Sequence, residues 1–188
     1  MSGRLLNLPN ILTLARIGAI PLVIVFYVLP ASWARPTAAL LFLASSATDW
    51  LDGYLARRWN QTSAFGRFLD PVADKLVVAA ALVLLVQGHP HSHIAVPAII
   101  VIGREITVSA LREWMAEIGE RGRVAVSTVG KSKTALQMTA ITLMLWEHPL
   151  AGLPVYEFGV ALFYVAAGLT LWSMMLYLRA AWPSLRKA

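Results

Sequence analysis

Four aspartates, two glycines and an arginine are gathered between two long apolar runs of the sequence. The stretch reads D-W-L-D-G-Y-L-A-R over 49–57 and, eight residues later, G-R-F-L-D-P-V-A-D over 66–74. A charged side chain at the centre of a membrane helix costs about 2.5–3.5 kcal/mol on insertion scales, so four carboxylates need a compensating partner. We expect that partner to be a pair of divalent cations.

The spacing of the aspartates supports this expectation. Asp49 and Asp52 are three residues apart and Asp70 and Asp74 are four apart, so each pair shares one face of a helix. Two helices that meet at these faces would bring four carboxylates to one pocket, where bare like charges would repel. Mg²⁺ and Mn²⁺ prefer oxygen ligands, which makes the four aspartates candidate ligands of two such cations.

The residues beside Asp52 indicate what else the pocket would take. Gly53 and Ala56 would leave a smooth helix surface that a bulky ligand could approach closely. Arg57 follows Gly53 by one turn, and its guanidinium could bind a phosphate through two donors. Metal ligands, a groove and a guanidinium together predict a site for a nucleotide diphosphate.

The same residues carry a family resemblance. D-x-x-D-G-x-x-A-R, eight residues and G-x-x-x-D-x-x-x-D resemble the signature of the CDP-alcohol phosphatidyltransferases at every fixed position. Three further segments, over 7–17, 103–114 and 130–138, are similar to the phosphatidylglycerophosphate synthase branch of that family. The last apolar run matches only in character.

This resemblance implies transfer of a phosphatidyl group from CDP-diacylglycerol to sn-glycerol 3-phosphate, with release of CMP. It implies that the first three aspartates bind the two divalent cations, and that Asp74 shares a metal and acts as general base on the acceptor hydroxyl. It also implies a homodimer. The residues expected to line the nucleotide pocket are Asp52, Gly53, Ala56, Arg57 and Gly66.

The composition is that of a membrane protein. Of 188 residues, 58% are hydrophobic and 14% charged, whereas soluble domains are about 45–50% apolar and about 25% charged. We therefore expect one polytopic membrane domain over 1–188. The sequence has no cysteine, which excludes a disulfide framework and a thiolate metal site.

Six apolar runs have about the length of 20 residues that a membrane-spanning helix needs. They predict an all-α integral membrane protein with six transmembrane helices, preceded by a short interfacial segment over 1–10. Asp70 and Pro71 resemble the N-cap and first residue of the third helix. The sixth run shows no catalytic signal. The runs cover 11–29, 36–56, 70–87, 94–115, 132–147 and 155–179.

The placement of basic residues predicts the orientation. If both termini are cytoplasmic, only Arg35 of the 16 lysines and arginines falls on the opposite side, which agrees with the positive-inside rule. The aspartates then lie at the cytoplasmic face of the inner membrane. The histidines of H-P-H-S-H over 89–93 fall in an outer turn. We expect a solvated turn there rather than a metal site, because Pro90 breaks a helix and no carboxylate is nearby.

Two further polar sets lie inside the predicted spans. Arg104, Arg112, Lys131 and Lys133 could hold the phosphate of the acceptor, or the arginines could form a structural network with glutamates.

Asn10, Thr13 and Arg16 recur every three residues on one face of the first span. They could contact nucleotide or lipid phosphates. Alternatively they form interhelical hydrogen bonds, with Arg16 snorkelling to the interface.

Two other functions share parts of the pattern. A sibling enzyme with serine, inositol phosphate or phosphatidylglycerol as acceptor would keep the aspartates and differ in the basic set. A cation-coupled transporter would also place carboxylates in spans, but it predicts broken helices and gives no role to Gly53, Ala56 and Arg57. Release of CMP from CDP-diacylglycerol distinguishes the enzymes from the transporter.

Overall fold

The computed structural model of the chain is all-helical in its described part, with six α-helices and no β-strand. The described residues are 8–58, 64–90, 93–120 and 128–186. At Pro9, 49–57, Ala64, Arg67 and 128–132 the description covers the backbone alone. Most of the predicted interfacial segment, residues 1–7, lies outside the described residues.

Each apolar run of the sequence forms a helix. In lipid, a helix satisfies its backbone hydrogen bonds within one segment, and the observed helices extend past the predicted runs by up to six residues at an end. The fifth helix begins four residues before its predicted start. The helices are α1 (Leu8–Val28), α2 (Ala34–Arg58), α3 (Ala64–Gly88), α4 (Ala95–Glu117), α5 (Thr128–Trp146) and α6 (Val155–Leu185).

The predicted start of the third helix is wrong. α3 begins at Ala64, so Asp70 is not an N-cap and Pro71 lies inside the helix. Proline favours a first turn because it has no N–H to donate, but here it removes only the bond to the carbonyl of residue 67. Because the helix continues past it, Asp70 and Asp74 stand together on one uninterrupted α3.

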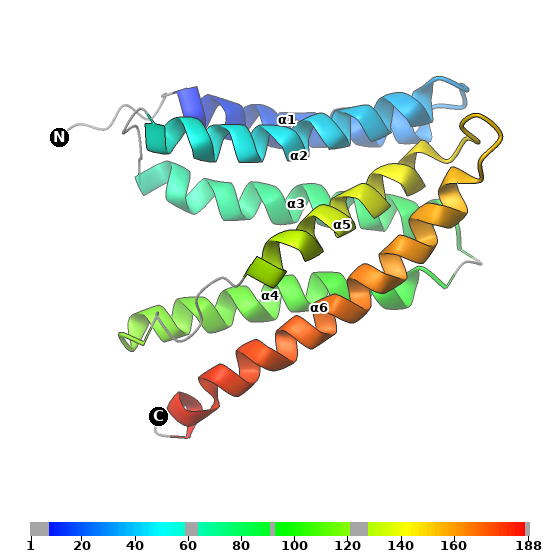
Figure 1. Cartoon of the computed structure of the whole chain (residues 1–188). Helices are drawn as coiled ribbons and strands as arrows, with labels where there is room; N and C mark the ends of the chain where they lie inside the picture. The colour runs from blue at the N-terminus through cyan, green and yellow to red at the C-terminus, as the bar shows by residue number, and fades with distance from the viewer. Residues whose placement is uncertain (1–7, 59–63, 91–92, 121–127, 187–188) are drawn as a thin grey trace.

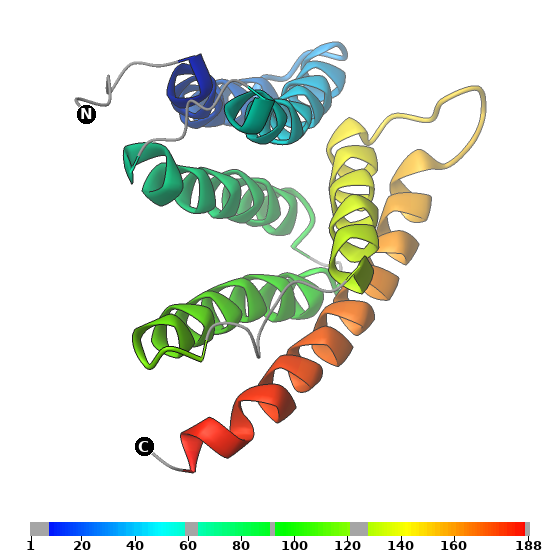
Figure 2. The same ribbon diagram turned by 60° about the vertical axis from the view of Figure 1, so that its left-hand side comes forward.

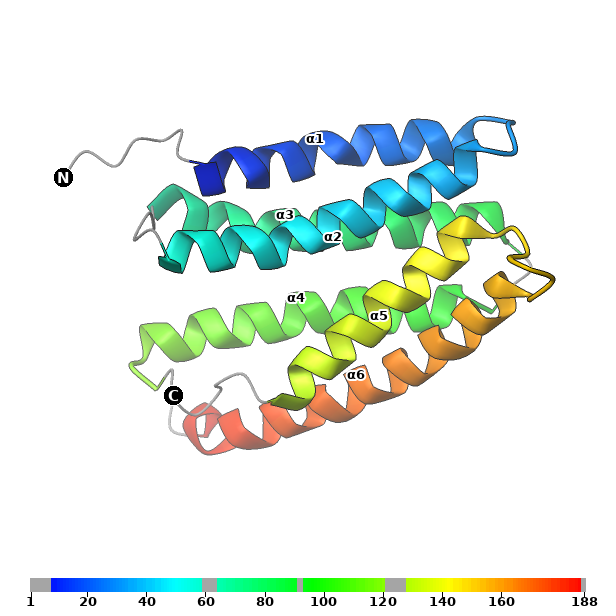
Figure 3. The same cartoon turned by 45° about the horizontal axis from the view of Figure 1, so that its top comes forward.

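The helices pack as two pairs around a central α3 (Figures 1 and 2). α1 and α2 run side by side and α1 also packs on α3, while α5 and α6 form a second pair that crosses the others obliquely. α4 packs on α6, and α5 also contacts α2. Figure 3 shows that α1 begins and α6 ends at the same end of the bundle, where α2 ends and α3 begins. That end therefore carries Asp70 and Asp74.

The outward surface of the bundle is strongly apolar. Ile99, Phe68 and Val96 are more than three-fifths exposed, and exposed apolar surface on this scale is typical of contact with lipid or protein. Among the described residues, two helices, Asn10–Val28 and Val155–Leu185, are long and apolar enough to cross a membrane by length and composition.

A cluster of polar side chains closes the opposite end of the bundle. Arg35 pairs with Glu147 and lies over the ring of Tyr27, 4.3 Å from its centroid. His89 stacks on Tyr156 with centroids 4.3 Å apart and places Nε2 3.3 Å from Oε1 of Glu147. Burial, and then the charge of Arg35, holds the pKa of His89 below its ordinary value of 6.5. At neutral pH the ring is therefore uncharged beside a carboxylate that Arg35 already balances.

The two described histidines of the H-P-H-S-H loop have different surroundings. His89 turns into the bundle, and His93 is exposed, with its carbonyl accepting a hydrogen bond from Tyr164 at 2.9 Å. His91 lies outside the described residues.

Close backbone contact holds α5 against α6. Gly159 faces α5, where a Cβ would meet Met144 Cγ at 2.9 Å and the backbone nitrogen of Met144 at 3.0 Å. Small residues allow helices in membranes to approach in this way. Nine residues later, a Cβ at Gly168 would meet no atom within 4 Å. The two glycines of α6 therefore differ in what faces them.

We predict opposite effects of alanine at these two glycines. Gly159→Ala should destabilise the protein by about 1–3 kcal/mol, the usual cost of overpacking. Gly168→Ala should leave stability unchanged or raise it by up to about 1 kcal/mol, because alanine favours a helix over glycine. Thermal unfolding in detergent measures both, and equal destabilisation by the two variants would contradict the packing described for α5 and α6.

Candidate functional site

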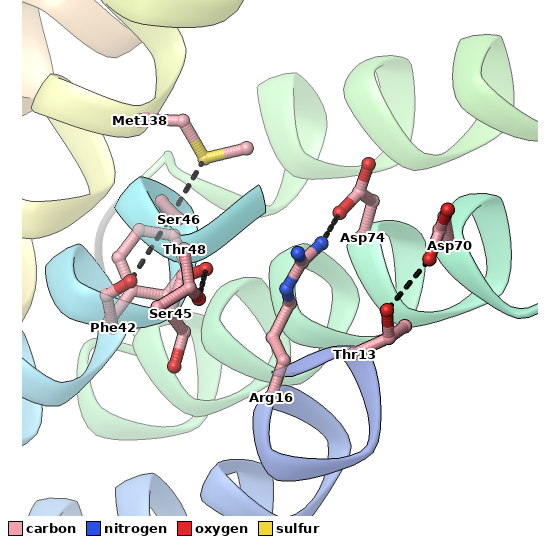
Figure 4. Close-up of polar contacts among 9 residues, drawn as sticks. All are labelled: Thr13, Arg16, Phe42, Ser45, Ser46, Thr48, Asp70, Asp74 and Met138. Carbon is pink, nitrogen blue, oxygen red and sulfur yellow. Dashed lines mark hydrogen bonds and ion pairs between the residues drawn. The ribbon is translucent and has the colours of Figure 1, made fainter. Parts of the chain in front are cut away.

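Two contacts join α1 to the aspartates of α3. Thr13 Oγ1 donates a hydrogen bond to Asp70 Oδ1 at 2.7 Å, and Arg16 Nη1 forms an ion pair with Asp74 Oδ1 (Figure 4). Thr13 and Arg16 are three residues apart on α1, and Asp70 and Asp74 are four apart on α3. Each pair therefore lies on one side of its helix, and these two sides face each other. The face of α1 that the sequence singled out therefore orients the two carboxylates.

Burial differs sharply between the partners of the ion pair. The side chain of Arg16 is 1% exposed, whereas that of Asp74 is 41% exposed. A guanidinium taken out of water loses several kcal/mol of solvation unless a counter-charge compensates, so Asp74 allows Arg16 to be buried. Of the alternatives that the sequence left open for Arg16, the structure shows an interhelical contact and not snorkelling. The carboxylate, in contrast, stays accessible to a ligand.

The two carboxylates suit a hard cation. In Figure 4 the second oxygen of each points away from α1 and to the same side. The donors are carboxylate oxygens alone, which is the ligand chemistry of Mg²⁺ and Mn²⁺. Among the described side chains there is no group of three or more potential metal ligands. Asp70 and Asp74 supply half of the predicted set.

The other half of the predicted set lies at the end of α2. The backbone of 49–57 forms the last turns of that helix, and its end lies beside the start of α3 (Figure 3). Gly66 is buried in the first turn of α3. The predicted site residues whose side chains lie outside the described part are Asp49, Asp52, Gly53, Ala56, Arg57 and Lys131.

Polar contacts tie this part of α2 to α5. Ser46 donates to the carbonyl of Phe42 at 3.0 Å and lies 3.6 Å from Met138 Sδ of α5. Two residues along α2, Thr48 donates to the carbonyl of Ser45 at 2.7 Å. Figure 4 shows these residues beside the Arg16–Asp74 pair. α2 is thus in contact with the helix that carries Lys133.

A second polar cluster joins α4, α5 and α6. Arg104 Nη1 contacts Glu105 Oε1 at 2.5 Å, and Lys133 Nζ lies 3.7 Å from the same oxygen. Arg112 belongs to the same electrostatic cluster as Lys133 and donates from Nη2 to the hydroxyl of Tyr177 at 2.7 Å. The structure therefore brings together three of the four predicted basic residues, and also forms the arginine–glutamate contact that the sequence left open.

Among the described side chains, positive charge is in excess in this basic cluster. Arg104 and Lys133 share Glu105, and the described contact of Arg112 is the hydroxyl of Tyr177. Lys133 is 2% and Arg104 9% exposed. Lys133 Nζ and the Nε atoms of both arginines are buried and have no hydrogen-bond partner in the described part of the chain. Buried donors without acceptors are costly, so an anion would complete this arrangement.

Sequence reasoning missed two members of the basic cluster. Ser173 and Tyr177 are buried on α6, one turn apart, and each contacts an arginine of α4. The available signal was two polar side chains at helical spacing in an otherwise apolar run. This signal is ambiguous in the sequence, because a tyrosine near the end of a span is also typical of the membrane interface.

An apolar groove lies between α1 and α3. It has a volume of about 330 Å³, and its lining is Ile20, Ile24, Leu76, Ala79, Ala80, Val83 and Leu84. Because Leu76 and Asp74 are two residues apart, they lie on different sides of α3.

Comparison with known proteins places this geometry in context. The sequence model described as CDP-alcohol phosphatidyltransferase matches residues 6–172. A protein of Salmonella choleraesuis strain SC-B67 named CDP-diacylglycerol--glycerol-3-phosphate 3-phosphatidyltransferase is 52% identical over 93% of this chain and 94% of its own length. Proteins of the same name from Shigella flexneri and Escherichia coli K12 are 51% identical over the same shares.

Proposed function

The chain belongs to the CDP-alcohol phosphatidyltransferase family, and we propose that it transfers the phosphatidyl group of CDP-diacylglycerol to sn-glycerol 3-phosphate, releasing CMP. The observation that carries the proposal is the pairing of this family's aspartates with a buried basic cluster. A phosphorylated acceptor needs such a cluster, because its phosphate must be held apart from the diphosphate of the donor.

The aspartate motif would hold the donor's diphosphate through two divalent cations. Asp49, Asp52, Asp70 and Asp74 provide carboxylate oxygens alone, and Asp70 and Asp74 are already oriented by α1. When bound, the cations supply neutralisation of the diphosphate charge and of the leaving phosphate. We assign the nucleotide pocket to the residues of the motif around them: Asp52, Gly53, Ala56, Arg57 and Gly66.

Asp74 is the proposed general base. It would accept the proton of the primary hydroxyl of glycerol 3-phosphate as that oxygen bonds to the phosphatidyl phosphorus and the bond from phosphorus to the CMP oxygen breaks. Its accessible carboxylate and its fixed partner Arg16 support this role. Arg16 and Thr13 would act through the aspartates, and direct substrate contacts by Asn10, Thr13 and Arg16 remain a prediction.

The basic cluster would bind the acceptor. Its buried donors lack acceptors in the described chain. A guanidinium group can donate two hydrogen bonds at once to the oxygens of one phosphate. We assign the acceptor phosphate to Arg104, Arg112 and Lys133, with Lys131 as a fourth member. The groove between α1 and α3 is suited to an acyl chain of the donor, because all its lining residues are apolar.

The proposed setting is the inner membrane, with six spans, both termini cytoplasmic and the aspartates at the cytoplasmic face. The apolar outer surface and the shared end of α1 and α6 support it. Glycerol 3-phosphate is water-soluble, so its binding site must open to water, which in this orientation is the cytoplasm. We also propose a homodimer, which follows from the family resemblance.

Release of CMP is the first test. Purified protein in detergent with Mg²⁺ or Mn²⁺ should release CMP from CDP-diacylglycerol with glycerol 3-phosphate, and not with serine, inositol phosphate or phosphatidylglycerol. Asp74→Asn should lower kcat at least about 100-fold, the lower end of general-base contributions. Glu113→Gln, which removes an exposed carboxylate of α4, should retain activity.

Other results of this assay would change the proposal. Release with a different acceptor would keep the family chemistry and overturn the substrate. Folded protein that releases no CMP with any acceptor would favour the transporter.

Loss of a cation from the basic cluster should affect one substrate alone. Lys133→Met should raise KM for glycerol 3-phosphate at least about tenfold, because hydrogen bonds to charged groups contribute about 1.5–3 kcal/mol and about 1.4 kcal/mol is tenfold in affinity. KM for CDP-diacylglycerol should stay within twofold. Arg179→Gln removes an exposed cation of α6 and should change neither constant. An equal rise in both constants in Lys133→Met would contradict the assignment.

Cysteine labelling should establish the orientation, because the sequence contains no cysteine of its own. We predict that a membrane-impermeant maleimide added to spheroplasts labels Leu150→Cys, in the loop before α6, and labels Glu117→Cys, at the end of α4, only after lysis. Both native side chains are exposed. The reverse pattern would place the aspartates on the outer face.

A further inference from the structure

α6 contacts both arginines of the basic cluster through a single aromatic side chain. The hydroxyl of Tyr177 accepts a hydrogen bond from Arg112 Nη2 at 2.7 Å. Its ring centroid lies 5.0 Å from the guanidinium carbon of Arg112 and 5.8 Å from that of Arg104. One turn earlier on α6, Ser173 Oγ accepts a bond from Arg104 Nη2 at 3.3 Å. Tyr177 therefore lies against both cations that α4 presents.

These contacts restrain side chains that would otherwise separate. The two guanidinium groups repel each other, and each arginine loses rotamer entropy when it is held in place. The face of an aromatic ring attracts cations, and the attraction is stronger when the contact is desolvated. Tyr177 is 8% exposed, so its ring offers both arginines a desolvated, attractive surface.

The restrained arginines keep donors for a ligand. A guanidinium has five N–H groups, and the described contacts of Arg112 use one of them on Tyr177. Those of Arg104 use its Nη atoms on Glu105 and Ser173. The buried Nε donors of both arginines and the ammonium of Lys133 have no hydrogen-bond partner in the described chain. Tyr177 thus fixes the arginines without consuming their capacity to bind an oxyanion.

We propose that Tyr177 is a positioning residue for the acceptor, which holds Arg104 and Arg112 in the arrangement that binds the phosphate of glycerol 3-phosphate. This inference rests on the proposed function for the identity of the acceptor. Preorganisation of binding groups raises affinity by lowering the ordering cost on association. Tyr177 therefore sets the affinity for the phosphorylated acceptor, and it contributes neither to the chemical step nor to binding of the donor lipid.

Two substitutions separate the hydroxyl from the ring. Tyr177→Phe removes the acceptor of the Arg112 bond and keeps the aromatic face, so KM for glycerol 3-phosphate should rise about three- to tenfold, as expected for one hydrogen bond to a charged group. Tyr177→Leu removes both interactions, and its KM should rise further, at least tenfold above that of the native protein. In both variants kcat and KM for CDP-diacylglycerol should stay within twofold.

The matched control is another tyrosine of the same helix. Tyr156 stacks on His89 at the opposite end of the bundle, and Tyr156→Phe should leave all constants within twofold. Thermal unfolding of each variant in detergent checks that the fold is retained. If Tyr177→Leu is unfolded, Tyr177→Phe alone decides the question.

Calorimetric titration with inorganic phosphate, in the absence of donor lipid, gives a readout independent of turnover. Tyr177→Phe and Lys133→Met should both weaken phosphate binding, and Tyr156→Phe should not.

The outcomes distinguish this inference from the proposed function. If Lys133→Met raises the acceptor KM and weakens phosphate binding while Tyr177→Phe does neither, the basic cluster stands and the role of Tyr177 is overturned. If Tyr177→Phe weakens phosphate binding although glycerol 3-phosphate is not a substrate, Tyr177 still positions the arginines and the proposed acceptor is wrong. A fall in kcat with unchanged KM values in Tyr177→Phe would also overturn the inference.

Discussion

The arrangement depends on the requirement that a charge inside an apolar helical bundle be balanced by a partner on another helix. The Arg16–Asp74 pair satisfies it between α1 and α3. Since an unpaired guanidinium in this position would cost several kcal/mol, the pair fixes which face of α1 meets α3. The Thr13–Asp70 bond then follows one turn away. Asp70 and Asp74 are therefore oriented by contacts within the protein.

The requirement also separates two polar regions of the bundle. α2 and α3 carry the four aspartates of the motif, while α4 and α5 carry the basic cluster, whose buried donors lack acceptors in the described chain. Contacts between α2 and α5, including Ser46 with Met138, join the two regions. This separation suits the proposed reaction, in which the diphosphate of one substrate and the phosphate of the other must be held at the same time.

The sequence predicts the helices more completely than the contacts between them. Each apolar run is long enough to form a helix, and the spacing of Asp70 and Asp74 alone places both on one face. The predicted start of α3 was wrong. Pro71 is compatible with the first turn of a helix and with an interior position, and only packing decides between the two. The partner of Arg16 and the role of Tyr177 could not be predicted, because they depend on which faces of distant helices oppose each other.

Charge balance separates a structural polar cluster from a binding one within the same protein. At one end of the bundle, Arg35 and Glu147 neutralise each other beside an uncharged His89, so that cluster needs no ligand and can serve packing alone. In the basic cluster, Arg104 and Lys133 share Glu105, Arg112 contacts Tyr177, and buried donors remain unsatisfied in the described chain. Both clusters contain a tyrosine against an arginine. The aromatic contact is therefore not what marks a binding site. The mark is uncompensated charge that the fold nevertheless buries and restrains, because stability alone would favour neutral residues at those positions.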